Sequence, residues 1–373
     1  MATARFIYDN PYKCSDVYYA TKFLAPDPLV YFEFRGKKYI AVDVLEYGRA
    51  KKEAKVDKVL LAQNYTKNIE IRKGFVIEVM DVIFKKFGIK TLEVHPNFPF
   101  ALAEQFAKLK YRVVSGKSPF FPERSQKNTY EKNAIIESQK ATFKMIGLVE
   151  KILIESKIRG NRIYHKNKLL TSEMLKEAVL IEALKRDYMM TTGLIISCGN
   201  HTVDPHDDGE GFILPHKPII VDIFPKSQKT NYCGDATRTF CKGKAPLALQ
   251  KLYSTVKKAQ EIGLSLIKAG INGRTIHGSI TKYFDSLGYN TGKIKGAYQG
   301  FIHGTGHGLG LEVHDGEPTI GALDCVLKVG HVVSVEPGLY YRNIGGVRIE
   351  DIVYVTKTGC EILGHYPKKF EIL

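Results

Sequence analysis

Hydrophobic and polar residues change their spacing repeatedly along the first third of the chain. The stretches 29–34 and 38–42 are rich in β-branched and aromatic residues and are separated by Gly36, which predicts a β-hairpin. Apolar residues at 75–87 recur at helical spacing, and Gly88 is a natural end for that helix. Further segments predict a strand at 91–95, a helix at 100–110 and a strand at 111–114. These elements predict an α/β domain, and no catalytic constellation is evident in it.

Gly116, Pro119 and Pro122 mark a boundary near residues 115–127, which predicts domains at 1–125 and 126–373. Beyond the boundary the pattern predicts a sequence of longer elements: helices at 128–158, from Ser172 onward, at 247–269 and at 275–287, and strands at 193–197, 218–224, 236–240, 332–336 and 347–355. The helix from Ser172 should have an apolar face of Met174, Leu175, Val179, Leu180 and Leu184. A pair of helices followed by strands thus occurs twice, without a repeat of sequence.

The composition is that of a globular protein. With 373 residues, of which 44% are hydrophobic, the chain can form two domains with separate cores. The six cysteines are scattered without a Cys-x-x-Cys pair, which favours reduced thiols in a cytosolic protein. The N-terminus lacks the apolar core of a signal peptide and no segment is long and apolar enough to span a membrane, so we expect a cytoplasmic location.

The net charge of +16 raises the question of nucleic-acid binding. The lysines are spread along the whole chain in short pairs such as Lys51-Lys52 and Lys257-Lys258. Charge distributed in this way is more typical of a solvated surface than of a binding stripe. Nucleic acid is therefore not the expected partner.

Residues 301–315 contain three histidines, His303, His307 and His314, interspersed with glycines at 304, 306, 308 and 310. Glycine removes side-chain bulk, which suits a backbone that passes close to a ligand or to another strand. Taken alone, this stretch is equally compatible with a solvated loop and with a functional site.

Acidic residues interrupt several apolar, strand-like runs. Asp222 lies in such a run, where a lone buried carboxylate costs on the order of several kcal/mol unless it is paired or binds a cation. An ion pair with Arg238 is the simpler interpretation of Asp222. Asp235 follows 13 residues later (235 − 222), so a hairpin could bring the two aspartates together. Glu336 and Glu350 also lie within strand-like apolar runs, where glutamate is disfavoured.

Each of these acids alone has a structural explanation; Glu350, for example, could pair with Arg348. Four of them in one domain, together with a glycine-flanked histidine, are harder to explain by separate ion pairs. Like charges gathered in a medium of low dielectric constant repel strongly unless cations neutralise them. The pattern therefore predicts a site for two divalent cations.

The order Asp, Asp, His, Glu, Glu in these contexts resembles the pita-bread-fold metallopeptidases, a family that contains methionine aminopeptidase, aminopeptidase P and prolidase. The resemblance covers roughly residues 128–373, and the first domain resembles the creatinase-type N-terminal domain only in its pattern of elements. It implies an α/β (α+β) chain, with a creatinase-like domain before a pita-bread catalytic domain. The matching pieces are Ile220-Val-Asp-Ile-Phe, Gly234-Asp-Ala-Thr-Arg-Thr-Phe, the segment 303–315, Val335-Glu-Pro-Gly-Leu-Tyr and Gly346-Val-Arg-Ile-Glu-Asp.

By this resemblance the metal ligands would be Asp222, Asp235, His307, Glu336 and Glu350, with Asp235 and Glu350 shared by two ions. Four carboxylates and one imidazole form a mostly hard ligand set, so we expect Mn²⁺, with Co²⁺, Fe²⁺ or Zn²⁺ as alternatives. Two such ions would activate a shared water as hydroxide, and Glu336 would act as general base.

The resemblance also assigns roles around the metals. His206 and His314 match catalytic histidines that stabilise the tetrahedral intermediate, while His303, Arg348 and Tyr340 match substrate-binding and supporting residues of the proline-specific branch. The four-residue interval from His303 to His307 is typical of that branch. For His303, a packing or loop role remains an alternative.

The implied activity is hydrolysis of the Xaa-Pro bond in dipeptides or at the N-termini of peptides with proline at the second position. One departure is the interval of 13 residues between the two aspartates (235 − 222), two longer than usual, which bears on substrate preference. The alternatives are an aminopeptidase of other specificity and a non-catalytic pita-bread module that binds nucleic acid or a protein partner. Members of the family often form homodimers, so a homodimer is one expected assembly.

Overall fold

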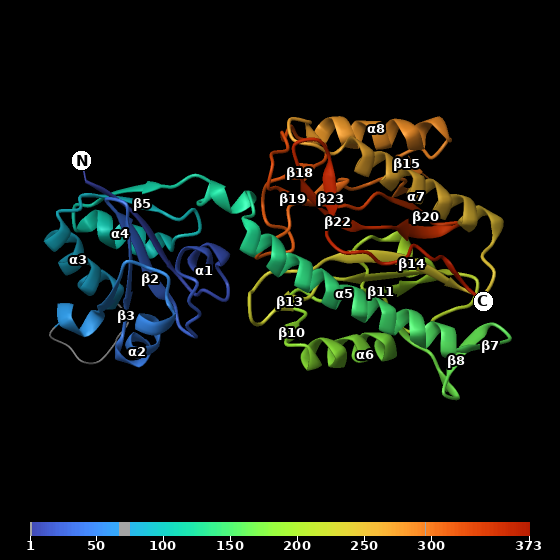
Figure 1. Ribbon diagram of the computed structural model, residues 1–373, viewed down its shortest axis with the longest axis horizontal. Coiled ribbons are helices and arrows are strands. Elements are labelled where there is room, and N and C mark those ends of the chain that lie inside the picture. The colour runs from blue at the N-terminus through green and yellow to red at the C-terminus, as the bar shows by residue number, and fades with distance from the viewer. Residues whose placement is uncertain (1, 67–74, 295) are drawn as a thin grey trace. The chain divides into compact units, whose positions relative to one another are not determined.

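The computed structural model describes residues 2–66, 75–294 and 296–373 (Figure 1). The chain divides into two compact units, one up to Arg124 and the other from Ser125 onward. All six cysteines are free thiols. None of the helices within the described ranges has the length and apolar character needed to cross a membrane.

Unit 1 is built on one mixed sheet. Its strands are β1 (Thr3–Asp9), β2 (Leu29–Phe34), β3 (Lys37–Val42), β4 (Lys58–Leu61), β5 (Thr91–Val94) and β6 (Arg112–Ser115), in the spatial order β4-β3-β2-β1-β5-β6. β1, β2 and β3 pair antiparallel, whereas β4, β5 and β6 run parallel to their neighbours. Arg35 and Gly36, with φ of 51° and 71°, turn the chain between β2 and β3 and so form the predicted hairpin.

Helices cover both faces of this sheet: α1 (Ser15–Thr21), α2 (Val44–Glu53), α3 (Phe75–Phe87) and α4 (Phe100–Lys108), with 3-10 turns at Ala62–Tyr65 and Pro122–Ser125. Alternate residues of a strand point to opposite faces. Phe6 therefore packs with Phe84 of α3, while its neighbour Ile7 joins a second core with Val17 of α1. The helix α3 ends at Phe87, before Gly88, as predicted.

Unit 2 encloses its strands between two pairs of helices, as Figure 1 shows. The helices are α5 (Thr129–Glu155), α6 (Ser172–Lys185), α7 (Leu247–Leu266) and α8 (Gly273–Ser286), with a 3-10 turn at Gly199–Val203. One core contains apolar residues of α5 and α6, such as Ile146 and Leu175, and the other contains residues of α7 and α8, such as Leu252 and Ile280. The site described below lies among the strands between these layers.

The strands of unit 2 are mostly short. They are β7 (Lys157–Arg159), β8 (Arg162–His165), β9 (Lys168–Leu169), β10 (Tyr188–Met189), β11 (Ile195–Cys198), β12 (Pro218–Ile223), β13 (Lys226–Ser227), β14 (Ala236–Lys242), β15 (Gly292–Ile294), β16 (Ala297–Gln299), β17 (Gly306–His307), β18 (Thr319–Ile320), β19 (Val332–Val335), β20 (Gly338–Tyr341), β21 (Gly345–Arg348), β22 (Asp351–Val355), β23 (Cys360–Ile362) and β24 (Glu371–Ile372). The sheets that frame the site are β11-β12-β14-β24, β19-β22-β23 and β20-β21.

Several predicted elements differ in the structure, and three of the differences have a visible cause or consequence. The helix expected to reach Ile158 ends at Glu155, because the residues after it pair as β7 with β8. The single strand expected at 347–355 is two strands, since Glu350 leaves the sheet and its backbone N–H donates to Thr237 O. On α6, the predicted apolar residues Leu180 and Leu184 are exposed.

The longer interval between Asp222 and Asp235 has a structural explanation. After β12, residues Lys226 and Ser227 form β13, which pairs antiparallel with β10. The backbone N–H of Gly234 then donates to Pro225 O, which brings the two ends of the segment between them together. The additional residues thus make a small strand pair, and the chain returns to pair β14 with β12.

The sequence pattern assigns no role to Gln299 or His331, and the structure gives each of them one. Gln299 accepts a hydrogen bond from the Arg342 backbone N–H and donates to Ile294 O. His331 is 2% exposed, and its Nδ1 accepts a hydrogen bond from the Lys328 backbone N–H. Burial, followed by the nearby charges of Lys328 and Lys127, lowers the pKa of His331 to about 4.

We predict that His331 destabilises the fold in acid. The unfolded chain binds a proton at the ordinary pKa of 6.5, whereas folded His331 does so only near 4, so its contribution is complete above pH 6.5 and is lost as the pH falls toward 4. The loss should be about 3 kcal/mol. The variant His331→Asn retains an acceptor oxygen without titrating. Its free energy of unfolding, measured in chelator at pH 7 and pH 4.5, should fall less than that of the wild type; an equal fall would contradict the assignment.

Candidate active site

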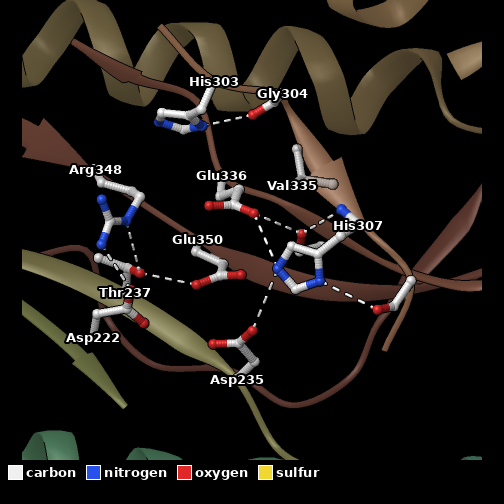
Figure 2. Close-up of polar contacts among 12 residues, drawn as sticks. Asp222, Asp235, Thr237, His303, Gly304, His307, Val335, Glu336, Arg348 and Glu350 are labelled. Carbon is white, nitrogen blue, oxygen red and sulfur yellow. Dashed lines mark hydrogen bonds and ion pairs between the residues drawn. The ribbon is translucent and has the colours of Figure 1, made fainter. Parts of the chain in front are cut away.

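Four carboxylates from separate strands lie together in unit 2 (Figure 2). Asp222 is in β12, Asp235 precedes β14, Glu336 follows β19, and Glu350 lies between β21 and β22. The register of β12 with β14 places Asp222 opposite Thr237, two residues after Asp235. Thr237 Oγ1 in turn donates to Glu350 Oε2 at 2.9 Å. Asp222, Asp235 and Glu350 are buried, with 8%, 3% and 2% exposure, so their charges are poorly solvated.

His307 points its ring at these acids. Its Nε2 lies 3.1 Å from Glu336 Oε1 and 3.6 Å from Asp235 Oδ2. Its Nδ1 lies 3.2 Å from Gly308 O, which can only accept a hydrogen bond, so Nδ1 carries a proton. In the neutral ring, Nε2 would then present a lone pair to the carboxylate oxygens. One ligand atom each of Asp235, His307 and Glu350 lie within 4.8 Å of one another, as in a metal site.

The backbone around His307 needs glycine and a small hydroxyl residue. A Cβ added at Gly306 would overlap the carbonyl oxygen of Ser334. Ser334 Oγ accepts from the His307 backbone N–H at 2.9 Å and donates to Glu336 Oε1 at 3.1 Å. Ser334 therefore holds both His307 and Glu336. Sequence reasoning missed it, although a serine within the buried run before Glu336 was a signal.

The cationic partners differ from those that the sequence suggested. Asp222 pairs with Arg348, whose Nη2 donates to Asp222 Oδ2 at 2.7 Å, and not with Arg238. Arg238 instead pairs with Asp351 at 2.7 Å. Arg348 is consequently not the partner of Glu350. These pairings connect strands more than a hundred residues apart, which no local sequence pattern specifies.

The excess of negative charge alters the protonation of the site. Burial first, and then the charges of Glu350, Asp222 and Glu336, raise the pKa of Asp235 well above its ordinary value. Burial and the charges of Glu336 and Asp222 likewise raise the pKa of Glu350. Both shifts favour the protonated form of these carboxyl groups relative to an exposed carboxyl group.

Glu336 and His307 form the ionised pair of the site. Burial opposes charge on both residues, but their mutual hydrogen bond and attraction outweigh it. The pKa of Glu336 is lowered to about 2 and that of His307 is raised to about 9. A proton on His307 thus supplies the positive charge that the carboxylates require.

The residues present fit divalent cations. Asp222 Oδ1 and Glu350 Oε1 are buried and have no hydrogen-bond partner among the described residues, which is costly for a carboxylate oxygen. The donor atoms are four carboxylates and one imidazole, a hard set that suits Mn²⁺, Fe²⁺ or Co²⁺ better than a thiolate-binding metal. Cations there would replace the protons and satisfy the unpaired oxygens.

Three further histidines border this cluster. His303 Nδ1 lies 2.7 Å from Gly304 O and its Nε2 lies 2.9 Å from the Tyr340 hydroxyl, which also accepts from Arg348 Nη1 at 2.8 Å. The ring of His314 lies 4.0 Å from that of His307, at an interplanar angle of 31°. His206 is exposed, and its charge acts on the pKa of both His303 and His314.

Burial first lowers the pKa of His303, to about 4, and lowers that of His314 as well. Neutral imidazoles can donate a hydrogen bond to a developing negative charge. The structure thus brings the sequence-predicted residues of the second domain into one neighbourhood. Tyr340 and Arg348 are buried, with 0% and 3% exposure. Tyr340 contacts His303 and Arg348 contacts Asp222, so both act as supporting residues beneath the cluster.

The model of metallopeptidase family M24 matches residues 154–357. The uncharacterized peptidase YqhT of Bacillus subtilis is 34% identical over 180 residues, covering 48% of this chain and 48% of that protein. An uncharacterized peptidase of Staphylococcus haemolyticus is 33% identical over 180 residues, with the same coverage. The aligned part of the chain spans about half the length of these relatives.

Solved structures share the fold over nearly the whole chain. The X-Pro aminopeptidase from Thermotoga maritima has a TM-score of 0.81 at 21% identity, covering 100% of this chain and 98% of that one. The Xaa-Pro dipeptidase from Bacillus anthracis has a TM-score of 0.81 at 23% identity, and the prolidase from Pyrococcus horikoshii 0.78 at 24%; both comparisons cover 99% of this chain and 95% of the other. The chain has a mixed α/β structure with the pita-bread fold, and it belongs to metallopeptidase family M24.

Proposed function

We propose that this protein hydrolyses the Xaa-Pro bond in dipeptides or at peptide N-termini, in a metal-dependent reaction. The observation that carries the proposal is the cluster of four carboxylates around His307, in which Arg348 pairs only with Asp222. The structures with the same fold that are named X-Pro aminopeptidase, Xaa-Pro dipeptidase and prolidase support the proline preference. Six free thiols favour a reducing compartment, and we propose the cytoplasm.

Asp222, Asp235, His307, Glu336 and Glu350 would hold two divalent ions; ligand atoms of Asp235, His307 and Glu350 lie within 4.8 Å of one another, and Asp222 and Glu350 each have an unpaired oxygen. Mn²⁺ is the first candidate because the ligand set is hard. When bound, the ions lower the pKa of water and polarise the peptide carbonyl. Because the pKa values of Asp235 and Glu350 are raised, binding of cations to these carboxyl groups should release protons to the solvent.

The chain's own residues would carry out the proton transfers. Ser334 and His307 both contact Oε1 of Glu336, so we assign Oε2 as the atom that takes the proton of the attacking water. His314 and His206 would donate hydrogen bonds to the oxyanion of the tetrahedral intermediate. His303 would contact the substrate, while Tyr340 and Arg348 fix its ring from behind.

The proposed activity is tested with matched peptides. We expect hydrolysis of Xaa-Pro dipeptides and Xaa-Pro-Xaa tripeptides in Mn²⁺, loss of activity in chelator, and recovery when Mn²⁺ is restored. Peptides with alanine in place of proline serve as controls and should react much more slowly. The dipeptide and tripeptide rates separate a dipeptidase from an aminopeptidase. Absence of any hydrolysis, together with tight binding of DNA, would favour the non-catalytic alternative.

Replacement of Asp235 tests the charge balance. In chelator, Asp235→Asn removes one of the repelling carboxylates, so its melting temperature should equal or exceed that of the wild type. At a Mn²⁺ concentration of 100 times Kd, each occupied site should stabilise the wild type by about 2.7 kcal/mol, and the variant by much less. Glu177→Gln, which neutralises an exposed carboxylate on α6, should respond as the wild type does. Equal stabilisation of all three proteins by Mn²⁺ would contradict this metal site.

Replacement of His314 tests the stabilisation of the intermediate. His314→Ala should lower kcat about 10²- to 10³-fold, as removal of an oxyanion donor does, with a smaller effect on KM. The control His365→Ala removes an exposed histidine near the C-terminus and should leave kcat unchanged. Steady-state kinetics on one Xaa-Pro substrate measures both effects. A kcat of wild-type magnitude in His314→Ala would exclude the assigned role.

A further inference from the structure

A deeply buried ion pair lies outside the ligand cluster. Lys127 Nζ is 2.9 Å from Asp315 Oδ2, and both side chains are only 1% exposed. The two residues are 188 positions apart in sequence. Transfer of two charges from water into a protein interior is unfavourable unless the pair is well bonded, and it adds little net stability compared with an apolar pair. A fold that retains such a pair often uses it to fix one arrangement of the chain.

The segment before Asp315 is folded around its carboxylate. The backbone N–H of Asp315 donates to Gly308 O at 2.8 Å, which closes the loop that begins directly after His307. At Gly310, an added Cβ would overlap Asp315 Oδ2 and lie 3.0 Å from Lys127 Cε, so the ion pair packs directly against the glycine backbone. Gly310 O accepts from the Cys233 backbone N–H at 2.8 Å. Three contacts therefore hold the loop: the hydrogen bond between Asp315 and Gly308, the hydrogen bond from Cys233 to Gly310, and the ion pair with Lys127.

Lys127 itself is held at a fixed place. Its backbone N–H donates to Gly330 O at 2.7 Å, in the turn before β19. The next residue, Asn128, begins α5 with a reciprocal capping box to Glu131. The ammonium group therefore extends from the rigid start of a helix, and it can set the position of the loop.

The residue directly before Asp315 is His314. The ring of His314 lies against that of His307, and His307, Glu336 and His206 act on its pKa through their charges. The side chain is exposed, so its direction depends on the backbone that carries it. We propose that Lys127 and Asp315 are positioning residues, which hold the 308–315 loop so that His314 faces the reacting carbonyl. This inference rests on the proposed function for the role of His314.

The test is a double-mutant cycle between Asp315 and His314. Asp315→Asn should lower kcat about 10- to 100-fold, as displacement of a reacting group by about 1 Å does, with little change in KM. In the His314→Ala background, the same change should have almost no further effect on kcat, because the residue that it positions is gone. An equal fall in both backgrounds, or a wild-type kcat in folded Asp315→Asn, would overturn the proposal.

A second variant separates positioning from stability. The double variant Lys127→Met/Asp315→Leu replaces the pair by apolar groups, which should maintain the melting temperature while kcat falls to the same extent as in Asp315→Asn. Asp16→Asn is the control, since it breaks the partly buried pair with Arg124 in unit 1 and should leave kcat unchanged. Failure of both Asp315→Asn and the double variant to fold would assign the pair to stability alone and would also overturn the proposal.

A readout without catalysis distinguishes failure of the inference from failure of the proposed function. In metal-free protein, the His314 ring signals are assigned in an NMR spectrum by their loss in His314→Ala. They should shift in Asp315→Asn, while the signals of His365 remain in place. Unshifted His314 signals would overturn the positioning role even if the enzyme is active. A wild-type protein inactive on every peptide would refute the proposed function, and the His314 signals would still decide the inference.

Discussion

The mutual repulsion of four carboxylates is the constraint on which the centre of unit 2 depends. Asp222 lies in β12, whereas Asp235, Glu336 and Glu350 directly adjoin β14, β19 and β22, and three of the four acids are almost completely buried. In a medium of low dielectric constant, such charges would drive the strands apart. The repulsion is seen in the raised pKa values of Asp235 and Glu350, and in the pKa of His307, which its carboxylate neighbours raise to about 9 against the effect of burial. Divalent ions would cancel this repulsion with the carboxylates ionised.

Arg238, a buried cation beside the cluster, is paired with groups other than the four carboxylates. Arg238, 1% exposed, donates to the backbone oxygens of Thr237 and Glu350 and to the Asp351 carboxylate. Asp351 also pairs with Lys368 at 2.8 Å. Removal of one partner from a buried pair of this kind costs about 3–5 kcal/mol. Arg238 thus fixes the backbone of Glu350 without neutralising its side chain, so the framework preserves the negative charge of the site.

Local sequence patterns were enough to predict most of the elements. The spacing of apolar residues and Gly88 defined α3, and the interruption of apolar strands by Asp222 and Glu350 identified the candidate site. The partners of those acids could not be predicted, because Arg348 and Asp222 are 126 residues apart and meet only through the packing of β12 against β21. For the same reason, the sequence did not reveal that Glu350 interrupts the predicted strand, because its backbone N–H bonds to Thr237 on a distant strand. The contact of Ser334 with His307 also joins residues that are distant in sequence.

Paired divalent ions are proposed to cancel the repulsion within this cluster. Crystals grown with Mn²⁺ and measured on both sides of the manganese absorption edge would test it most directly. We expect two anomalous peaks per chain, both bounded by the carboxylates of Asp222, Asp235, Glu336 and Glu350 and by Nε2 of His307. Diffraction that shows no such peaks there, with the carboxyl groups bonded only to one another and to protein cations, would contradict it.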